Sequence, residues 1–278
     1  MIDVNEHVEK ASEQITLGSD DVWRVSDVSS VSFPGDGHEA LGDIEERSFW
    51  FNHRNAALLK LMEQFPYEGP FLDIGGGSGY VSLGLTRASR PSIVLEPDPA
   101  GARNAAKRKL PVIHASLDDA QLKPCSFHGA GMFDVLEHIE DDVGALRSVH
   151  RILASDGRLF LTVPAHSALW SNEDVYVGHY RRYGKRSVSS VLHEAGFEVD
   201  YAGYFFGALV PAIFLLRSIP SRFASADNPG SYKEGDHKLP PAPIGSVISA
   251  TLEHELRAIG KGRALPLGSS VIVVARSV

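Results

Sequence analysis

Residues 72–80 read LDIGGGSGY, and this stretch decides the fold. A short apolar run leads into four glycines in five positions, and the pattern of a helix follows. A strand, a glycine turn and a helix in this order form the first unit of a doubly wound sheet. The glycines let the backbone approach a ligand, and the helix N-terminus offers free N–H groups. The spacing D-x-G-x-G-x-G places Asp73, Gly75, Gly77 and Gly79 at this turn.

The spacing of the glycines narrows the class of ligand. A P-loop is excluded because no lysine follows the turn. A dinucleotide fingerprint starting at Gly75 needs glycine at position 80, which is Tyr80, and one starting at Gly76 needs glycine where Ser78 stands. Glu96 ends the next apolar run, 21 positions after Gly75, where a carboxylate can accept both hydrogen bonds of a ribose diol. The sequence therefore predicts a ligand with a ribose that need not carry a pyrophosphate; a solvated glycine turn without a ligand is the alternative.

Apolar runs of strand length alternate with helical patterns along the chain. Strands are predicted at 71–75, 92–96, 111–115, 129–136, 157–165, 198–205 and 269–278. This alternation predicts an α/β fold with a doubly wound, mostly parallel sheet and helices on both faces. We expect residues 1–42 to be an irregular N-terminal extension and 43–278 to be the main domain. Residues 207–266, between strands six and seven, are too long for a plain connection and are predicted to form a helical insertion or lid.

Composition and charge exclude several classes of protein. Acidic residues outnumber basic ones, 35 against 27, and the formal charge of −8 argues against a nucleic-acid binder. Cys125 is the single cysteine, so no intrachain disulfide forms and a reducing, cytoplasmic location is expected. The first fourteen residues lack the basic and apolar regions of a signal peptide. No metal site is predicted, because the sequence contains neither C-x-x-C nor H-E-x-x-H, nor acidic residues at EF-hand spacing.

The apolar stretch 203–216 is about fourteen residues long and contains Pro211. A transmembrane helix needs roughly 20 apolar residues, so this stretch is not expected to span a bilayer. Buried packing, a lid over a substrate, a homodimer surface and a peripheral membrane contact all remain open for it.

The turn, Glu96 and the segment FDVLEHIEDD (133–142) together resemble the class I S-adenosylmethionine-dependent methyltransferases, and the wording LEHIEDD is typical of their small-molecule branch. The resemblance covers nearly the whole chain. It implies a Rossmann-like seven-stranded sheet with an antiparallel last strand, and S-adenosyl-L-methionine as the cofactor. The residues that it implies for cofactor binding are Trp50, Arg54, Asp73, Gly75, Gly77, Gly79, Glu96, Ser116, Leu117 and Asp134. Among these, Glu96 would hold the ribose, Ser116 and Leu117 would flank the adenine, and Arg54 would reach the cofactor carboxylate.

Methyl transfer from a sulfonium requires a positioned nucleophile and, for a hydroxyl or ammonium acceptor, removal of a proton. The candidate catalytic residues are His166, His179 and Tyr183, in the segments TVPAH (162–166) and VGHYRRYGKRS (177–187). The candidate acceptor-binding residues are His138, Tyr180, Arg181 and Arg182, with an arginine as a clamp for an anionic acceptor. The alternatives are a packed His138, a solvated His166 and a basic surface turn at 177–187.

The leading hypothesis is methyl transfer to a small-molecule or glycan- or lipid-precursor acceptor. Oxygen is the first expectation for the acceptor atom, and nitrogen or sulfur remain open. An NAD(P)-dependent oxidoreductase and a non-catalytic scaffold that binds the cofactor are the alternatives. Tyr80, in place of the last fingerprint glycine, counts against the oxidoreductase.

Overall fold

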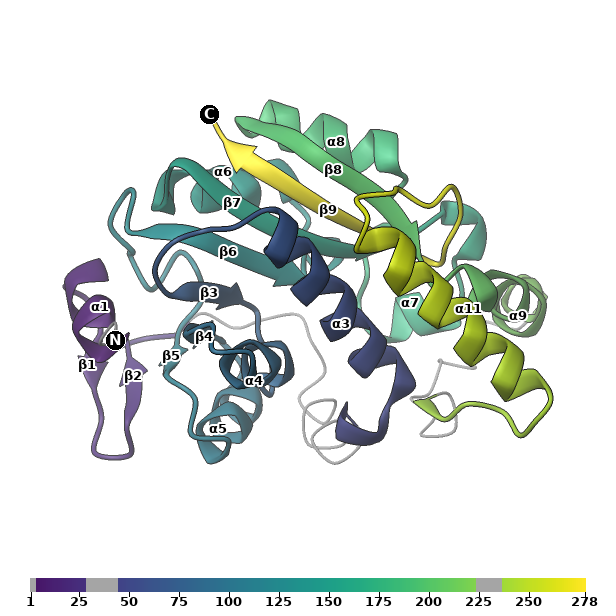
Figure 1. Ribbon diagram of the computed structural model, residues 1–278. Helices are drawn as coiled ribbons and strands as arrows, with labels where there is room; N and C mark the ends of the chain where they lie inside the picture. Colours follow the sequence, from purple (N-terminus) through teal and green to yellow (C-terminus); the bar gives the residue numbers. More distant parts are fainter. Residues whose placement is uncertain (1–3, 29–44, 224–236) are drawn as a thin grey trace.

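The computed structural model describes residues 4–28, 45–223 and 237–278, which form an α/β structure around one sheet (Figure 1). The described strands pair in the order β1-β2-β5-β4-β3-β6-β7-β9-β8. Their bounds are β1 Thr16–Leu17, β2 Val22–Arg24, β3 Phe71–Ile74, β4 Ser92–Leu95, β5 Val112–His114, β6 Phe127–Phe133, β7 Leu153–Pro164, β8 Phe197–Phe205 and β9 Ser270–Ser277. All seven predicted strands form, as β3 to β9.

Pairing directions confirm the predicted topology. β3 to β7 all run parallel to one another, whereas β9 runs antiparallel to both β7 and β8. The chain moves outward from β3 through β4 to β5, then returns to the other side of β3 as β6. This reversal makes the carboxyl ends of β3 and β6 the switch point of the sheet, the place where open α/β sheets bind ligands.

Helices cover both faces of the sheet (Figure 1). Along β3, Leu72 and Ile74 pack in the cluster that contains α1, α6 and α8, while Phe71 packs on the opposite face with α3, α4 and α11. Successive strand side chains point to opposite faces, so an apolar strand can be buried on both sides. The longer described helices are α1 Val4–Ala11, α3 Phe49–Gln64, α4 Tyr80–Arg87, α5 Pro99–Lys107, α6 Asp142–Ile152, α7 Asn172–Tyr176, α8 Lys185–Glu194 and α11 Ile244–Ile259.

Local sequence explains several helix starts. The side chains of Ser48 and Asp98 accept hydrogen bonds from backbone N–H groups in the first turns of α3 and α5, as N-capping residues do. Short 3-10 turns η1 Glu45–Arg47, η2 Leu136–His138 and η3 Ser167–Leu169 lie before α3, after β6 and after β7. β6 ends at Phe133 rather than 136 because Asp134 has a left-handed φ of 59°, which turns the chain into η2.

The expectation of an irregular N-terminal region is wrong for residues 4–28. They form α1 and two short strands, and β2 pairs in parallel with β5 at the sheet edge. Trp23 on β2 is buried in the core. The N-terminal residues therefore extend the expected seven-stranded sheet to nine strands; residues 29–42 of the predicted extension lie outside the described residues.

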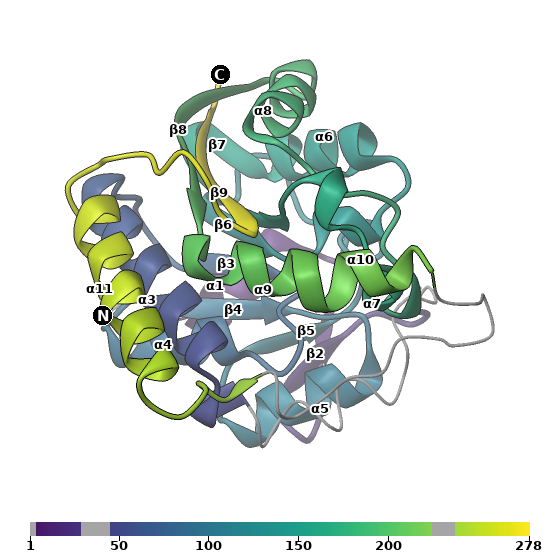
Figure 2. The same cartoon turned by 90° about the vertical axis from the view of Figure 1, so that its right-hand side faces the viewer.

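The connection from β8 to β9 contains η4 Gly207–Leu209, α9 Val210–Ile213, the π-helical turn η5 Phe214–Ser218, α10 Ile219–Ser221 and α11. Figure 2 looks toward the carboxyl ends of the parallel strands and shows the run from α9 to α10 lying across them. α11 packs against α3 in the second core cluster through Leu252 and Ile259. Among the described segments, no helix is both long and apolar enough to cross a membrane.

Candidate functional site

The glycine turn after β3 has the backbone conformation that its sequence predicts. Gly75, Gly77 and Gly79 all have positive φ, at 66°, 55° and 76°. Gly79 is the N-cap of α4, and a Cβ at this position would lie 2.6 Å from Leu110 Cδ1. Glycine is needed here for both its φ and its small size. The N–H groups of all four glycines donate within the protein, to Leu95, Gly76 and Glu96, so the turn folds tightly at the switch point of the sheet.

Glu96 is held against this turn from the end of β4. Its buried carboxylate accepts hydrogen bonds from the backbone N–H of Gly77 and of Asp98, each at 2.7 Å. Burial raises the pKa of Glu96 to about 7, although these two N–H groups favour its charged form. A carboxylate oxygen has two lone pairs, so each Glu96 oxygen keeps acceptor capacity for a further donor.

Asp73 lies beneath the turn and is almost fully buried. Its Oδ2 accepts a hydrogen bond of 2.8 Å from Ser82 on α4. Burial raises the pKa of Asp73 to about 6, while the Ser82 hydroxyl and the charge of Arg54 oppose this rise. The Asp73–Ser82 hydrogen bond thus links β3 to α4 and stabilises the turn between them.

Arg54 on α3 reaches the carboxyl end of β6. Its Nη1 donates to Oδ2 of Asp134 at 2.6 Å, and its guanidinium lies 4.9 Å from the centre of the Trp50 ring. Trp50 in turn stacks on Phe206, with ring centroids 5.4 Å apart. The structure therefore brings the predicted residues of α3 together with Asp134, 80 positions away.

A second hydrogen-bond network at the turn was not predicted from the sequence. Glu45 is buried and accepts hydrogen bonds from Ser78 Oγ and, at 2.9 Å, from Arg108 Nη2. Arg108 also donates to the carbonyl oxygen of Ser78 at 3.1 Å. These three side chains fix the end of the glycine turn that leads into α4. Because they come from three separate segments, no spacing in the sequence marks them.

Ser116 and Leu117 follow β5 as predicted. The Ser116 hydroxyl accepts from the backbone N–H of Asp119 and donates to its carboxylate, at 3.1 and 2.7 Å. Leu117 packs partly buried against the core. Ser116 therefore stabilises a local turn at the edge where the adenine was expected.

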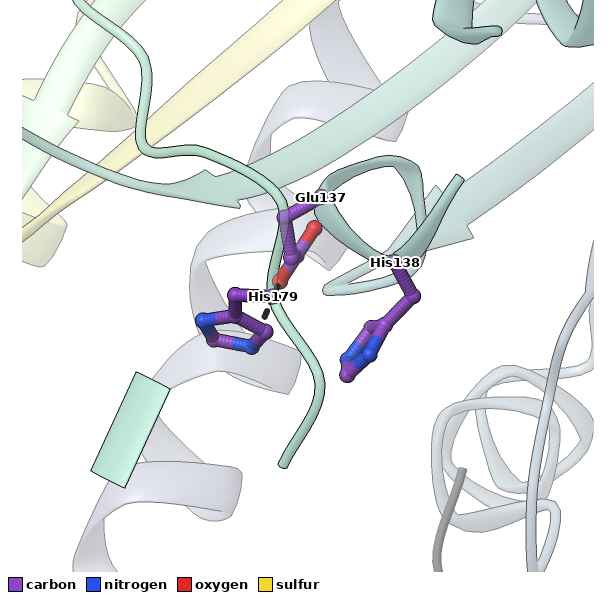
Figure 3. A group of neighbouring side chains, drawn as sticks. All are labelled: Glu137, His138 and His179. Carbon is purple, nitrogen blue, oxygen red and sulfur yellow. Dashed lines mark ion pairs between the residues drawn. The ribbon is translucent and has the colours of Figure 1, made fainter. Parts of the chain in front are cut away.

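The loop 177–184 comes back to the segment that follows β6. The backbone N–H of Tyr180 donates to the carbonyl of Glu137, and the rings of His138 and His179 lie 4.6 Å apart (Figure 3). His179 Nδ1 is 2.8 Å from Asp174 Oδ1, while His179 Nε2 is 3.8 Å from Glu137 Oε1. Burial, then the neighbouring charge of Asp134, raises the pKa of Glu137 well above its usual range.

The predicted arginine clamp binds carboxylates of the chain itself. Arg182 donates to both carboxylate oxygens of Asp174, at 2.7 and 3.0 Å, and Arg181 pairs with Asp142 at 2.8 Å. The hydroxyl of the buried Tyr183 also donates to Asp142, and burial raises its pKa far above the usual range. In this structure all three side chains are therefore engaged with carboxylates of the chain itself, and the acid–base role of Tyr183 and the clamp role of the arginines stay predictions. Tyr180, by contrast, is exposed.

His166 lies just beyond β7 with a left-handed φ of 57°. Its ring stacks on Tyr204 at 4.7 Å, and its Nε2 is buried and accepts no hydrogen bond from the described residues. Burial, together with the charge of Arg182, lowers the pKa of His166. The His166 ring is thus partly buried and stacked, and both its burial and the charge of Arg182 disfavour the charged imidazolium.

Comparisons with known proteins agree with this geometry. A family model described as a methyltransferase domain matches residues 47–202, more than half of the chain. The probable S-adenosylmethionine-dependent methyltransferase Rv3030 of Mycobacterium tuberculosis is 24% identical over 176 residues. This match covers 62% of the chain and 64% of the relative, so the chain spans less than two thirds of that protein's length.

Two solved structures share the fold. Phosphoethanolamine N-methyltransferase 2 of Haemonchus contortus, in complex with S-adenosyl-L-methionine, gives a TM-score of 0.55 at 16% identity and covers 88% of this chain and 57% of its own. The cyclase SpnF gives 0.52 at 18% identity, covering 81% of this chain and 80% of its own. These two neighbours are named for different reactions, so at this identity the likeness shows the fold alone. On the match of the family model over residues 47–202, the chain belongs to the methyltransferase-domain family.

Proposed function

We propose that the protein is an S-adenosyl-L-methionine-dependent methyltransferase acting on a small molecule or a glycan or lipid precursor. The observation that carries this proposal is Glu96, a buried carboxylate anchored by the N–H of Gly77 at the switch point of the sheet. The M. tuberculosis relative, whose name states the same cofactor, supports it. Tyr80, at the position of the last dinucleotide glycine, disfavours an oxidoreductase.

The residues at the turn fit this cofactor. The remaining lone pairs of the two Glu96 oxygens match the two donors of a ribose diol. The left-handed glycines give the backbone close access, and the N-terminus of α4 adds a positive dipole end. Arg54 lies next to Asp134, so this pair supplies one positive and one negative group for an amino-acid end. Trp50 adds an aromatic wall beside them.

When bound, the cofactor supplies an electrophilic methyl group on a sulfonium. The chain must then position the acceptor and, for oxygen or nitrogen, take its proton. His166 is our candidate base because its lowered pKa keeps the imidazole neutral and its Nε2 makes no hydrogen bond with any described residue. Arg182 donates to the carbonyl of Ala165, the residue before His166, and to the carboxylate of Asp174, which also contacts His179. Arg182 therefore holds His166 and His179 in one network.

The helical run 207–223 supports an acceptor with an apolar part. It docks on the start of α7 through the ion pair of Arg217 with Glu173, at 2.6 Å, and the hydrogen bond from the Asn172 N–H to the Ser221 hydroxyl. On its outer side Leu215, Leu216 and Phe223 are exposed, Phe223 to 86%. Exposed large apolar side chains beside a site mark a surface for an apolar ligand or partner. We infer that this run is a lid over a lipid-linked acceptor. A peripheral membrane contact and a homodimer would use the same exposed surface, and both stay predictions. The cytoplasmic location also stays a prediction.

Thermal-shift measurements on the full chain test the cofactor. We expect S-adenosylhomocysteine to raise the Tm and NADPH to leave it unchanged. Glu96→Ala should lose the shift, whereas Glu63→Ala, on the exposed face of α3, should keep it. A shift with NADPH and none with S-adenosylhomocysteine would overturn the proposal.

Transfer of a labelled methyl group from the cofactor to panels of acceptors tests the reaction. Panels of polyprenyl-phosphate-linked sugars, free sugars and small phenols separate lipid-linked from soluble acceptors. Labelling confined to acceptors without an apolar part would contradict the role of the 207–223 run. Binding of the cofactor with no labelled product in any panel would favour the scaffold.

A further inference from the structure

The segments that follow β6 and α7 bring together three side chains of the kinds that bind metals, one glutamate and two histidines (Figure 3). One atom from each of Glu137, His138 and His179 lies within 4.8 Å of the other two. Glu137 and His138 are adjacent in η2, whereas His179 comes from a loop 41 positions later. Neither of the usual zinc motifs has this spacing, which is why the sequence predicts no metal.

Glu137 is the unusual member of this cluster. Its side chain is only 1% exposed, and neither carboxylate oxygen accepts a hydrogen bond from any described residue. The two nearby arginines are directed elsewhere, Arg54 to Asp134 and Arg182 to Asp174. Buried carboxylates are paired, hydrogen-bonded or metal-bound in folded proteins. A cation between Glu137 and the two histidines would satisfy this carboxylate.

His179 is held in the orientation of a metal ligand. Its Nδ1 lies 2.8 Å from Asp174 Oδ1, and Asp174 is itself held by two hydrogen bonds from Arg182. A proton on Nδ1 leaves the lone pair on Nε2, the atom that faces Glu137 at 3.8 Å. Metal-bound histidines commonly have this carboxylate partner on the far nitrogen, which fixes both tautomer and ring orientation.

We propose that Glu137, His138 and His179 bind one divalent transition-metal ion of the Zn²⁺ or Mn²⁺ kind. Two imidazoles and one carboxylate suit these ions, whereas Mg²⁺ and Ca²⁺ prefer oxygen ligands alone. Bonds of about 2.1 Å in a tetrahedral site place ligand atoms about 3.4 Å apart, so the three atoms, now within 4.8 Å of one another, must move together by up to about 1.4 Å to bind an ion. Three protein ligands leave a coordination position for water or another oxygen ligand.

The position of this site gives the cation a role. Glu137 lies three residues beyond Asp134, at the carboxyl end of β6. An acceptor oxygen that completes the coordination would be held at the same sheet edge as the proposed cofactor site. This role rests on the proposed methyltransferase function, whereas cation binding itself does not.

Isothermal titration of the EDTA-stripped full chain with Zn²⁺, Mn²⁺ and Mg²⁺ tests the site. We expect one tight site for Zn²⁺ or Mn²⁺ and weaker binding of Mg²⁺. Glu137→Gln and His179→Ala should each abolish the tight site, and Asp174→Asn should weaken it about 10–100-fold, as is typical of a lost outer partner. His193→Ala, which removes an exposed histidine of α8, should bind like the unaltered chain.

Loss of metal binding in a variant must be distinguished from misfolding of that variant. Absence of the metal site must also be distinguished from absence of methyltransferase function. Circular dichroism and urea unfolding test whether Glu137→Gln and His179→Ala remain folded, and neither measurement depends on the proposed function. His138→Asn, at a partly exposed position, provides a third variant should one of these unfold. Tight binding that persists in folded Glu137→Gln, or no tight site in the unaltered chain, would overturn the metal site whatever the S-adenosylhomocysteine result.

Discussion

The guanidinium of Arg54 lies 2.6 Å from the carboxylate of Asp134 and joins helix α3 to the turn after β6. The Arg54 side chain is 8% exposed and that of Asp134 is 22% exposed, so water screens the pair only in part. Removing one partner of such a pair leaves the other charge poorly solvated.

Arg54→Ala should therefore lower the free energy of unfolding by about 2 kcal/mol, less than a fully buried pair would lose. It should also weaken S-adenosylhomocysteine binding, because Arg54 is our candidate for the cofactor carboxylate. Urea unfolding and titration calorimetry measure the two effects. Arg147→Ala, which breaks the exposed pair with Glu194, should cost under about 1 kcal/mol and leave binding intact. Equal costs for the two variants would contradict the assignment.

Affinity for S-adenosylhomocysteine should rise with pH through about 7. Burial raises the pKa of Glu96 to about 7. A ribose hydroxyl needs a lone pair as acceptor, and the ionised carboxylate of Glu96 offers lone pairs on both oxygens, whereas the protonated carboxyl carries a hydrogen on one of them. Below pH 7 the protonated carboxyl must release its proton for full binding, so the affinity should fall up to tenfold per pH unit. Calorimetric dissociation constants between pH 6 and 8 measure this slope. Glu96→Gln should bind weakly with a flat profile; a slope unchanged in that variant would assign the titration to another group.

Gly79→Ala should destabilise the fold more than Gly69→Ala, although both glycines have similar positive φ, 76° and 71°. A Cβ at position 69 meets no atom within 4 Å, so that variant carries only the left-handed strain, about 1–2 kcal/mol. A Cβ at position 79 would lie 2.6 Å from Leu110, which adds an overpacking cost of about 1–3 kcal/mol. Denaturant unfolding of both variants gives the difference. Indistinguishable stabilities would mean that the turn relaxes around the added methyl group.

Glu255→Ala should loosen the 207–266 insertion. The buried Glu255 accepts from the N–H groups of Phe206 and Gly207, at 2.8 and 2.6 Å, and lies 3.2 Å from His53 Nε2. Losing these acceptors leaves two N–H groups poorly satisfied and should cost about 2–4 kcal/mol. Limited proteolysis should cut the insertion faster, and urea unfolding gives the free energy. Glu253→Ala, exposed on the same helix, is the matched control and should change neither.

His166→Gln should lower kcat about 10²–10⁴-fold for an oxygen or nitrogen acceptor, the usual contribution of a general base. Since the pKa of His166 is lowered from 6.5, the unaltered enzyme should lose activity only in acid below that value, and the variant should lack this limb. Initial rates against pH with an acceptor from the labelling panels measure both. His128→Gln, at an exposed position of β6, should behave like the unaltered enzyme. Full activity of His166→Gln would point to a thioether acceptor, which needs no base.

The fold could be predicted where the information is local. The glycine turn, the continuous apolar runs and the helices between them are patterns of neighbouring residues, and they predicted seven strands and a parallel sheet. The antiparallel direction of the last strand was implied only by the resemblance to the class I methyltransferases. β1 and β2 were missed because strands of two and three residues are too short to show a period, and pairing with β5 stabilises β2. Glu96 was identifiable because its place at the end of a strand follows from that same local pattern.

The tertiary structure alone decided which charged groups meet. Arg182 has the composition of an anion clamp, but the fold places Asp174 against its guanidinium. Glu137 reads in the sequence as one acid among several in LEHIEDD, and only the return of the loop at His179 shows it buried beside two imidazoles. Propensity and periodicity arise from residues near in sequence, whereas burial and ion pairing depend on segments brought together by folding. The sequence by itself therefore determined the seven strands β3 to β9 and the glycine turn, and the packing of distant loops determined which charged groups meet at the carboxyl edge of the sheet.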